Sequence, residues 1–400
     1  MQIKRIVTVC AAVLLFAGGS FAQQKATPLL TVIDTALNKA IRQYRVLQAN
    51  LVATPEALPK TYYPLTKKFE TSKSSWWCSG FYPGSLNYLY EYSNDNSLWQ
   101  EATRAEKLLE KEQFNKGTHD LGFMMFCSFG NANRLMHTKE YDEILMNSAR
   151  SLSTRFNPTV GCIQSWNATA KWKFPVIIDN MMNLELLFWA TQHSGDSSFY
   201  KIAVTHANTT IRNHYRPDYS SWHVVDYDPA TGNVNVKQTA QGYADYSAWA
   251  RGQAWGLYGF VVMYRFTKDA KYLKQATNIA KFLMNHPNLP ADKIPYWDYN
   301  SHDIPATYRD ASASAITASA LLELSKYDKV KSASYVNFAE QVIRTLSSRT
   351  YTADPGENGG FILKHSTGHL PGSSEVDVPL TYADYYYIEA MMRYRKMKKY

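Results

Sequence analysis

The sequence predicts an all-α protein built as an (α/α)6 barrel, in which six outer helices enclose six inner ones. Two observations predict this fold: amphipathic segments alternate with apolar ones, and the amphipathic segments share a common start. In each, a short polar turn precedes an aromatic residue that opens an Ala-containing stretch of helical periodicity. The start recurs loosely about every 60 residues, as in stacked helix pairs. The aromatic residues are Trp99, Tyr141, Tyr200, Tyr272 and Tyr335.

The apolar segments are the predicted inner helices. They are poor in charge and rich in aromatic and small residues, and an all-round apolar helix is buried whereas an amphipathic one faces water. A further amphipathic segment at 27–50 completes the outer set, so that six helices of each kind alternate. The predicted inner helices span 82–93, 120–136, 180–194, 249–266, 310–326 and 377–395.

Residues 1–22 are predicted to be a signal peptide. Lys4 and Arg5 precede the apolar stretch "IVTVCAAVLLFAGG", and "SFA" supplies small residues up to Ala22. The apolar stretch is short for a membrane span and no Cys follows it, so we expect no membrane anchor. The mature chain is predicted to be exported, to the periplasm or beyond. Residues 23–400 are predicted to form one domain, because no linker or composition shift divides them.

The composition of the chain limits which classes of binding partner are expected. The formal net charge of +9 suggests an anionic partner. Apart from the tail "RYRKMKKY" there is no run of Lys and Arg, so an acidic saccharide is expected rather than nucleic acid. After the leader three cysteines remain, which allows one disulfide at most, and their spacing matches no metal motif. No metal, cofactor, HExxH, GxSxG or phosphate-binding glycine motif is predicted, and the oligomeric state stays open.

The N-termini of the inner helices should gather at one end of the barrel, because all inner helices must run the same way. Polar and aromatic residues precede those helices, and helix N-termini favour anions. Long connections such as 213–248 also lie at this end, where "FNPTVGCIQSW" and "HVVDYDPATGNVNVKQTAQG" are expected to form short hairpins. The ligand site is therefore predicted at the N-terminal ends of the inner helices.

Asp120 and Asp179 open adjacent predicted inner helices and should be neighbours across the cavity mouth. Two such carboxylates can divide labour, one remaining ionised while burial and its neighbour raise the pKa of the other. Asp is also a preferred N-cap, and a helix N-terminus lowers a carboxylate pKa. We expect the pair to be functional. For Asp310 and Asp377 capping and site roles stay equally open.

Other residues near the same rim suit a saccharide. Trp77 and Trp255 could stack on a sugar ring. Arg251, at a buried helix start, needs an anionic partner, for example Asp245. Hydrogen bonds to hydroxyl or carboxylate groups are expected from His119, His223, Thr239, Gln241 and Arg251. For His223 alone, a structural role stays equally open.

Five stretches, "WWCSGFYPGSLNYLYEYSND", "HDLGF", "IIDNMMNLELLFWA", "QGYADYSAWARGQAWGLYGF" and "VDVPLTYADYYYIEAM", resemble the unsaturated glucuronyl hydrolases of glycoside hydrolase family 88. The resemblance runs in order over 76–395. It implies an (α/α)6 barrel and, as substrates, lyase-generated oligosaccharides with a 4,5-unsaturated uronic acid at the non-reducing end. It also implies that Asp179 is the catalytic acid/base and Asp120 the second essential carboxylate. Substrate-binding positions implied by the resemblance are Trp77, His119, Thr239, Gln241, Arg251 and Trp255.

The implied reaction explains two carboxylates. Asp179 would protonate C4 of the enol ether, Asp120 would stabilise the positive charge at C5, and water would add at C5. Two alternatives remain: an unsaturated rhamnogalacturonyl hydrolase, and a non-catalytic protein that binds acidic oligosaccharides.

Overall fold

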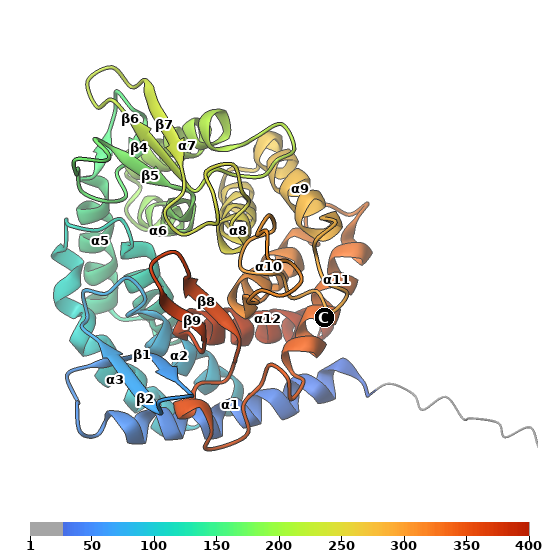
Figure 1. The fold of residues 1–400 in the computed structure, drawn as a ribbon. Helices are drawn as coiled ribbons and strands as arrows, with labels where there is room; N and C mark the ends of the chain where they lie inside the picture. Colours follow the sequence, from blue (N-terminus) through green and yellow to red (C-terminus); the bar gives the residue numbers. More distant parts are fainter. Residues whose placement is uncertain (1–26, 400) are drawn as a thin grey trace, which may run out of the picture.

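The computed structural model describes residues 27–399, so the predicted signal peptide lies outside the described part. Two concentric rings of helices form the barrel, which confirms the predicted fold class (Figure 1). The outer helices are α1 (Leu29–Leu51), α3 (Asn96–Leu109), α5 (Lys139–Ser153), α7 (Ser197–His214), α9 (Ala270–Asn285) and α11 (Ser332–Leu346). The inner helices are α2 (Phe81–Ser93), α4 (Asn131–Leu135), α6 (Leu184–Ser194), α8 (Ala250–Thr267), α10 (Ala311–Leu324) and α12 (Thr381–Lys399).

Four of the six outer helices, α3, α5, α7 and α9, begin at a side-chain cap. The carboxylates of Asp95, Asp196 and Asp269 accept the backbone N–H two residues later, and the Thr138 hydroxyl accepts that of the third residue after it. Such caps satisfy N–H groups that the helix itself leaves unpaired. Only one stripe of each outer helix is buried, as the amphipathic pattern predicts.

Most residues of the inner helices are buried. Every residue of α10 is buried, and its Ala and Ser residues let α8, α11 and α12 approach closely. The chain closes the ring by packing α12 against α2. One hydrophobic cluster runs from Leu29 to Tyr394 and includes residues of both rings.

Two inner helices are irregular at their starts, which the sequence pattern did not predict. The predicted helix at 120–136 is a π-helix over Gly122–Gly130 followed by α4, and the third inner helix begins as a 3-10 turn over Ile178–Asn183. The two starts touch: the Asn183 Oδ1 accepts the Phe123 N–H at 3.0 Å, and a Cβ on Gly122 would lie 2.5 Å from the Asn183 Cα. This close contact explains why Gly stands at 122.

Short antiparallel sheets accompany the helix ring. Both expected hairpins are present, and a strand outside them, β5, pairs with the second hairpin and leads into the 3-10 turn. The sequence pattern did not predict β5 or the two remaining hairpins. The strands are β1 (Leu58–Tyr63), β2 (Lys68–Ser72), β3 (Phe156–Asn157), β4 (Cys162–Ile163), β5 (Pro175–Ile177), β6 (Val224–Tyr227), β7 (Val234–Gln238), β8 (Ser366–His369) and β9 (Ser374–Val378).

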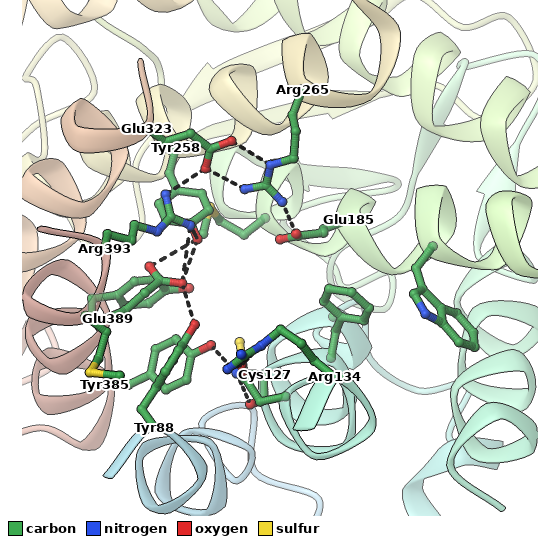
Figure 2. Close-up of a pocket in the computed structure, with 18 of the residues that line it drawn as sticks. Tyr88, Cys127, Arg134, Glu185, Tyr258, Arg265, Glu323, Tyr385, Glu389 and Arg393 are labelled. Carbon is green, nitrogen blue, oxygen red and sulfur yellow. Dashed lines mark hydrogen bonds and ion pairs between the residues drawn. The ribbon is translucent and has the colours of Figure 1, made fainter. Parts of the chain in front are cut away.

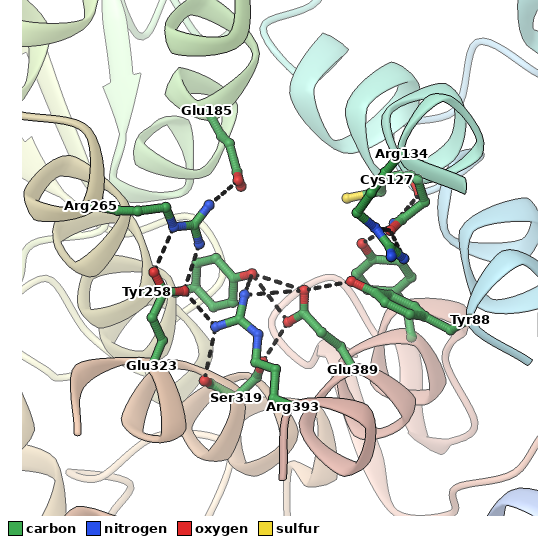
Figure 3. A network of polar contacts seen from close by, with 12 residues as sticks. Tyr88, Cys127, Arg134, Glu185, Tyr258, Arg265, Ser319, Glu323, Glu389 and Arg393 are labelled. Carbon is green, nitrogen blue, oxygen red and sulfur yellow. Dashed lines mark hydrogen bonds and ion pairs between the residues drawn. The ribbon is translucent and has the colours of Figure 1, made fainter. Parts of the chain in front are cut away.

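A cavity of about 600 Å³ lies among the C-terminal halves of the inner helices (Figure 2). Glu323 of α10 binds Arg265 of α8 and Arg393 of α12, while Arg265 also contacts Glu185 of α6 (Figure 3). Glu389 accepts hydrogen bonds from tyrosine and serine hydroxyls on three other inner helices. These bonds join neighbouring inner helices and leave the carboxylates of Glu323 and Glu389 fully engaged, which suits a structural role.

No helix within residues 27–399 is long and apolar enough to cross a membrane. In the same described part of the chain, no group of three or more His, Cys, Asp or Glu side chains is placed to hold a metal ion. Cys78, Cys127 and Cys162 are all free thiols.

Candidate active site

Asp179 lies at the bottom of a narrow chamber at the N-terminal ends of the inner helices. Strand β5 delivers the chain to Ile177, and the 3-10 turn then places the Asp179 carboxyl inside, where the residue is 7% exposed. Its Oδ1 has no hydrogen-bond partner among the described residues. The chamber of about 70 Å³ is lined by Trp77, His119, Asp120, Trp166, Ile177, Asp179, Gln241 and Arg251.

Burial raises the pKa of Asp179 to about 7. The nearby Arg251 guanidinium opposes this shift and the Asp120 carboxylate reinforces it. A carboxyl group with a pKa close to neutrality can give up a proton and take it back under ordinary conditions. Asp179 can therefore serve as the acid/base that the family resemblance implies at this position.

His223 presents an N–H group to Asp179. Its Nδ1 accepts the backbone N–H groups of Ala240 and Gln241 at 3.1 and 3.2 Å. Burial lowers the pKa of His223 well below its usual value, with Arg251 adding to the effect, so the ring is neutral. Its one proton must then sit on Nε2, which lies 3.7 Å from the Asp179 Oδ1. A small movement would convert this approach into a hydrogen bond that stabilises ionised Asp179.

Asp120 belongs to the same chamber and does not cap its helix. Its carboxylate accepts the Thr118 hydroxyl at 3.0 Å and lies 3.3 Å from His119 Nε2. No backbone N–H of the following turn donates to it, whereas its carbonyl accepts the Met124 N–H. Burial lowers the pKa of His119, which leaves that imidazole neutral beside the carboxylate. The structure thus places the Asp120 carboxylate in the cavity and not in a helix cap.

Arg251 is a buried cation, 1% exposed, at the start of α8. It donates to Asp310 at 3.0 Å and to the carbonyls of Thr367 and Gly368 at 2.6 Å each. The expected partner Asp245 is therefore wrong: its carboxylate accepts the Thr239 N–H instead. Asp310 also caps α10 by accepting the Ser312 N–H, so it serves both groups.

Outside the chamber is a vestibule of about 480 Å³ that opens to solvent. It shares Trp77, Asp120, Trp166 and Gln241 with the chamber, and Trp76 and Trp172 also line it. Gln241 donates to the Gly368 carbonyl at 3.2 Å, and the His369 ring donates to the Ala240 carbonyl at 3.0 Å. These bonds tie the β8–β9 hairpin to the loop of residues 239–247. An aromatic entrance thus leads to the two carboxylates.

Several predicted site residues lie elsewhere than expected. Trp255 is 0% exposed, packs on Phe123 and Tyr386 and does not line the chamber, so its stacking on a sugar stays a prediction. It lies four residues beyond Arg251, about 6 Å deeper along α8. Thr239 does not line the chamber or the vestibule, and its hydroxyl accepts the Gly242 N–H at 2.8 Å.

Of the two aspartates for which capping was left open, only one caps a helix. Asp377 does not cap α12; it lies in β9 and its carboxylate pairs with His365 at 2.7 Å. Asp310, by contrast, is a cap, as one of the two interpretations held.

Trp166, Trp172 and His369 were missed in the sequence. Each lies outside the inner helices, in a connecting segment or a short strand, and no spacing rule relates it to the aspartates. The one available signal was the concentration of Trp residues in the segment before Asp179, where Trp166 ends the first expected hairpin stretch and Trp172 follows it.

Two substitutions at His223 should separate its two roles. Asn places an acceptor near the Nδ1 position and keeps the loop bonds, whereas Gln places a donor near Nε2 and faces Asp179. We expect His223→Asn to lower kcat about 100-fold, since a preorganised donor is lost, and His223→Gln mainly to raise KM. Steady-state kinetics on an unsaturated disaccharide measure both, and identical effects on kcat and KM would contradict the division.

Comparisons with known proteins place the chain in a glycoside hydrolase family. The family model described as Glycosyl Hydrolase Family 88 matches residues 55–397. An unsaturated glucuronyl hydrolase of Formosa agariphila is 48% identical over 319 residues, which cover 79% of each chain. An unsaturated chondroitin disaccharide hydrolase of Streptococcus pneumoniae is 33% identical over 384 residues, covering 92% of this chain and 94% of the relative.

Solved structures give the same result. An unsaturated glucuronyl hydrolase specific for heparin superposes with a TM-score of 0.88 at 48% identity, covering 92% of this chain and 98% of the other. The unsaturated glucuronyl hydrolase of Bacillus sp. GL1 superposes with a TM-score of 0.85 at 28% identity, covering 91% and 97%. With the family model matching most of its length, the chain belongs to glycosyl hydrolase family 88.

Proposed function

We propose that this protein is an unsaturated glucuronyl hydrolase. It removes a 4,5-unsaturated uronic acid from the non-reducing end of oligosaccharides that polysaccharide lyases release. The observation that carries the proposal is the buried Asp179 carboxyl, whose pKa of about 7 lets it act as a proton donor in the chamber that also holds Asp120. The family and the 48% identical relative point to the same activity.

The reaction is a hydration of the enol ether. Protonated Asp179 gives its proton to C4, and the C4–C5 double bond becomes a single bond with positive charge shared between C5 and the ring oxygen. The Asp120 carboxylate stabilises this charge, because a preorganised charged group in a narrow chamber is worth more than one in bulk water. Asp179, now ionised, is stabilised by the His223 N–H and the Arg251 charge.

Water completes the reaction. Asp179 takes a proton from a water molecule, whose oxygen forms a bond to C5. The product is a hemiketal, which opens and releases the next sugar as the leaving alcohol. The distance between the carboxylates does not classify the enzyme as retaining or inverting, because the attacked carbon is not the anomeric one.

The decisive measurement follows the ultraviolet absorbance of the double bond. Lyase digests of heparin, chondroitin, hyaluronan, ulvan and gellan are each incubated with the protein. Heparin is placed first because a solved structure at 48% identity is described as specific for it. Loss of absorbance in at least one digest is expected. Unchanged absorbance in all five would contradict the proposal, and binding without consumption would favour a non-catalytic saccharide-binding protein instead.

The second candidate function, an unsaturated rhamnogalacturonyl hydrolase, is tested by a different substrate. An unsaturated rhamnogalacturonyl hydrolase would consume the corresponding pectin-lyase product and spare the glycosaminoglycan digests. The same absorbance assay separates the two activities.

The pH dependence should follow Asp179. Because burial raises its pKa, the carboxyl keeps its proton below about pH 7 and loses it above. The first step needs that proton, so kcat/KM should fall about tenfold for each further pH unit above 7. Measuring kcat/KM from pH 5 to 9 checks this, and a value still constant at pH 9 would contradict the assignment of Asp179 as the acid.

We also propose that the protein is exported after cleavage at Ala22, on the basis of the leader pattern in residues 1–22. N-terminal sequencing of the protein from the periplasm or medium should start at Gln23. Recovery of the intact leader from the cytoplasm alone would contradict export.

A further inference from the structure

The catalytic chamber does not account for the basic charge of the chain. The chain carries a formal net charge of +9, but the one cation that lines the chamber, Arg251, is paired with Asp310, and Asp120 and Asp179 lie beside it. Positive charge therefore gathers elsewhere. One such place is the groove between the outer helices α7 and α9, which has a volume of about 690 Å³.

The charged residues that line this groove are all cations. They are Arg212, Arg216, Lys271 and Lys274, and no carboxylate lines it. Lys271 is paired with Asp269 at 3.0 Å, but both side chains are nearly half exposed, where such pairs contribute little. The groove thus carries an excess of positive charge that an anionic ligand could neutralise.

Two of the other cations, Arg212 and Arg216, donate to neutral groups. Within residues 27–399, no carboxylate forms an ion pair with Arg212, Arg216 or Lys274. The Arg216 guanidinium donates to the carbonyls of Asp245 and Ser247 at 2.9 and 3.2 Å, so it is fixed in place. The carboxylates of Asp218 and Asp298 attract it without forming an ion pair. Those carbonyls belong to the loop of residues 239–247 that borders the vestibule, so the groove lies beside the catalytic end of the barrel.

A buried amide adds a hydrogen-bond donor. Gln275 lines the groove, is 6% exposed, and its Nε2 has no hydrogen-bond partner among the described residues. A buried N–H without an acceptor costs free energy that an oxygen of a ligand would recover. Cationic walls with an unpaired amide beneath them suit a ligand that carries both anionic groups and hydroxyl oxygens.

We propose that the α7–α9 groove binds a segment of acidic polysaccharide, separately from the catalytic chamber. The assignment of a glycan rests on the proposed function, since the substrates of that reaction are cut from such polymers. Polymer bound beside the entrance raises the local concentration of newly released oligosaccharides around the enzyme. Attraction between a cationic groove and a polyanion is long-ranged and weakens with salt.

The test measures binding of fluorescent intact heparin to the mature protein by anisotropy over a range of NaCl concentrations. The groove variant is Arg212→Gln/Lys274→Glu, which leaves the structural Arg216 untouched. The control variant, Lys111→Glu/Lys329→Gln, makes the same change of charge at two exposed lysines that do not line the groove. Each protein is also assayed for kcat/KM on an unsaturated disaccharide and for its thermal unfolding midpoint.

We expect the groove variant to bind heparin at least tenfold more weakly at low salt. The slope of log Kd against log salt should fall by about one to two, because each neutralised anionic group releases about one counterion. The control variant should bind like the unmodified protein, and both variants should keep its kcat/KM and unfolding midpoint.

Other results would overturn the proposal: no heparin binding by the unmodified protein, equal losses in both variants, or a single-stranded oligodeoxynucleotide of equal charge bound as tightly as heparin. Heparin binding with groove dependence but no turnover of any lyase product would refute the proposed function and leave the groove as a polyanion site.

Discussion

Asp179→Asn should reduce kcat by at least about 1,000-fold while the fold stays intact. The amide keeps the shape of the carboxyl group but has no acidic proton to give to C4, and acid/base side chains contribute about 10²–10⁴-fold to a rate. The ultraviolet absorbance assay measures the loss, and circular dichroism checks the fold. A turnover within tenfold of the unmodified protein would refute Asp179 as the acid.

The same substitution should stabilise the protein at alkaline pH. Burial raises the pKa of Asp179 from 3.8 in the unfolded chain to about 7 in the folded one, so the folded state holds this proton more tightly. Its contribution to stability is fully present below pH 3.8 and is lost as the pH rises through about 7. At pH 8 the unmodified protein buries a charge that Asn lacks.

Urea denaturation at pH 5 and pH 8 checks this effect. The gain in unfolding free energy of Asp179→Asn should grow with pH and reach at most about 4 kcal/mol at pH 8. A gain that is the same at both pH values would show that the carboxyl group does not carry the effect. Greater stability together with lost activity would mark Asp179 as a functional residue that costs the fold stability.

Arg393→Met should destabilise the fold by about 3–5 kcal/mol at pH 8, because it leaves buried carboxylates uncompensated. Arg393 is bound to Glu323 at 2.7 Å and to the Ser319 carbonyl at 3.1 Å, at the end of the barrel opposite the chamber. Burial alone would raise the pKa of Glu323, but the guanidinium groups of Arg265 and Arg393 outweigh it and lower that pKa. Removing one guanidinium therefore weakens the link between α10 and α12.

Arg45→Met is the matched control. Arg45 is paired with Asp95 at 2.8 Å, yet its side chain is 59% exposed, and exposed pairs contribute about 0–1 kcal/mol. Urea denaturation of both variants gives the comparison. Equal losses would refute the structural role of the network, and kcat/KM below the unfolding transition should be unchanged in both because neither residue approaches the chamber.

Local sequence patterns were sufficient to predict the order of the helices and the pairing of the two carboxylates. Asp120 and Asp179 hold equivalent places before adjacent inner helices, and a closed ring brings such places together whatever the details of packing. The chamber lined by both residues confirms the predicted location at the N-terminal ends of the inner helices. The resemblance to a family singled out the same two residues.

Contacts between residues far apart in the chain could not be predicted from local sequence patterns. Arg251 was expected to pair with Asp245, six residues earlier, but α8 and α10 lie side by side and bring Asp310 to it instead. The Asp245 carboxylate instead accepts a backbone N–H within its own loop. The π-helix at Gly122–Gly130 likewise depends on contact with Asn183, which no local periodicity reveals.

By itself, the sequence determined the barrel, its alternation of inner and outer helices and the end at which the carboxylates meet, since hydrophobic periodicity and helix direction are local properties. Only the tertiary structure decided that Trp255 is buried below the chamber, that Trp166 and Trp172 form its entrance, and that the pKa of Asp179 is raised to about 7. Burial depends on what the whole fold packs around a side chain. A pKa follows from that burial and from charges that the chain brings near from distant positions.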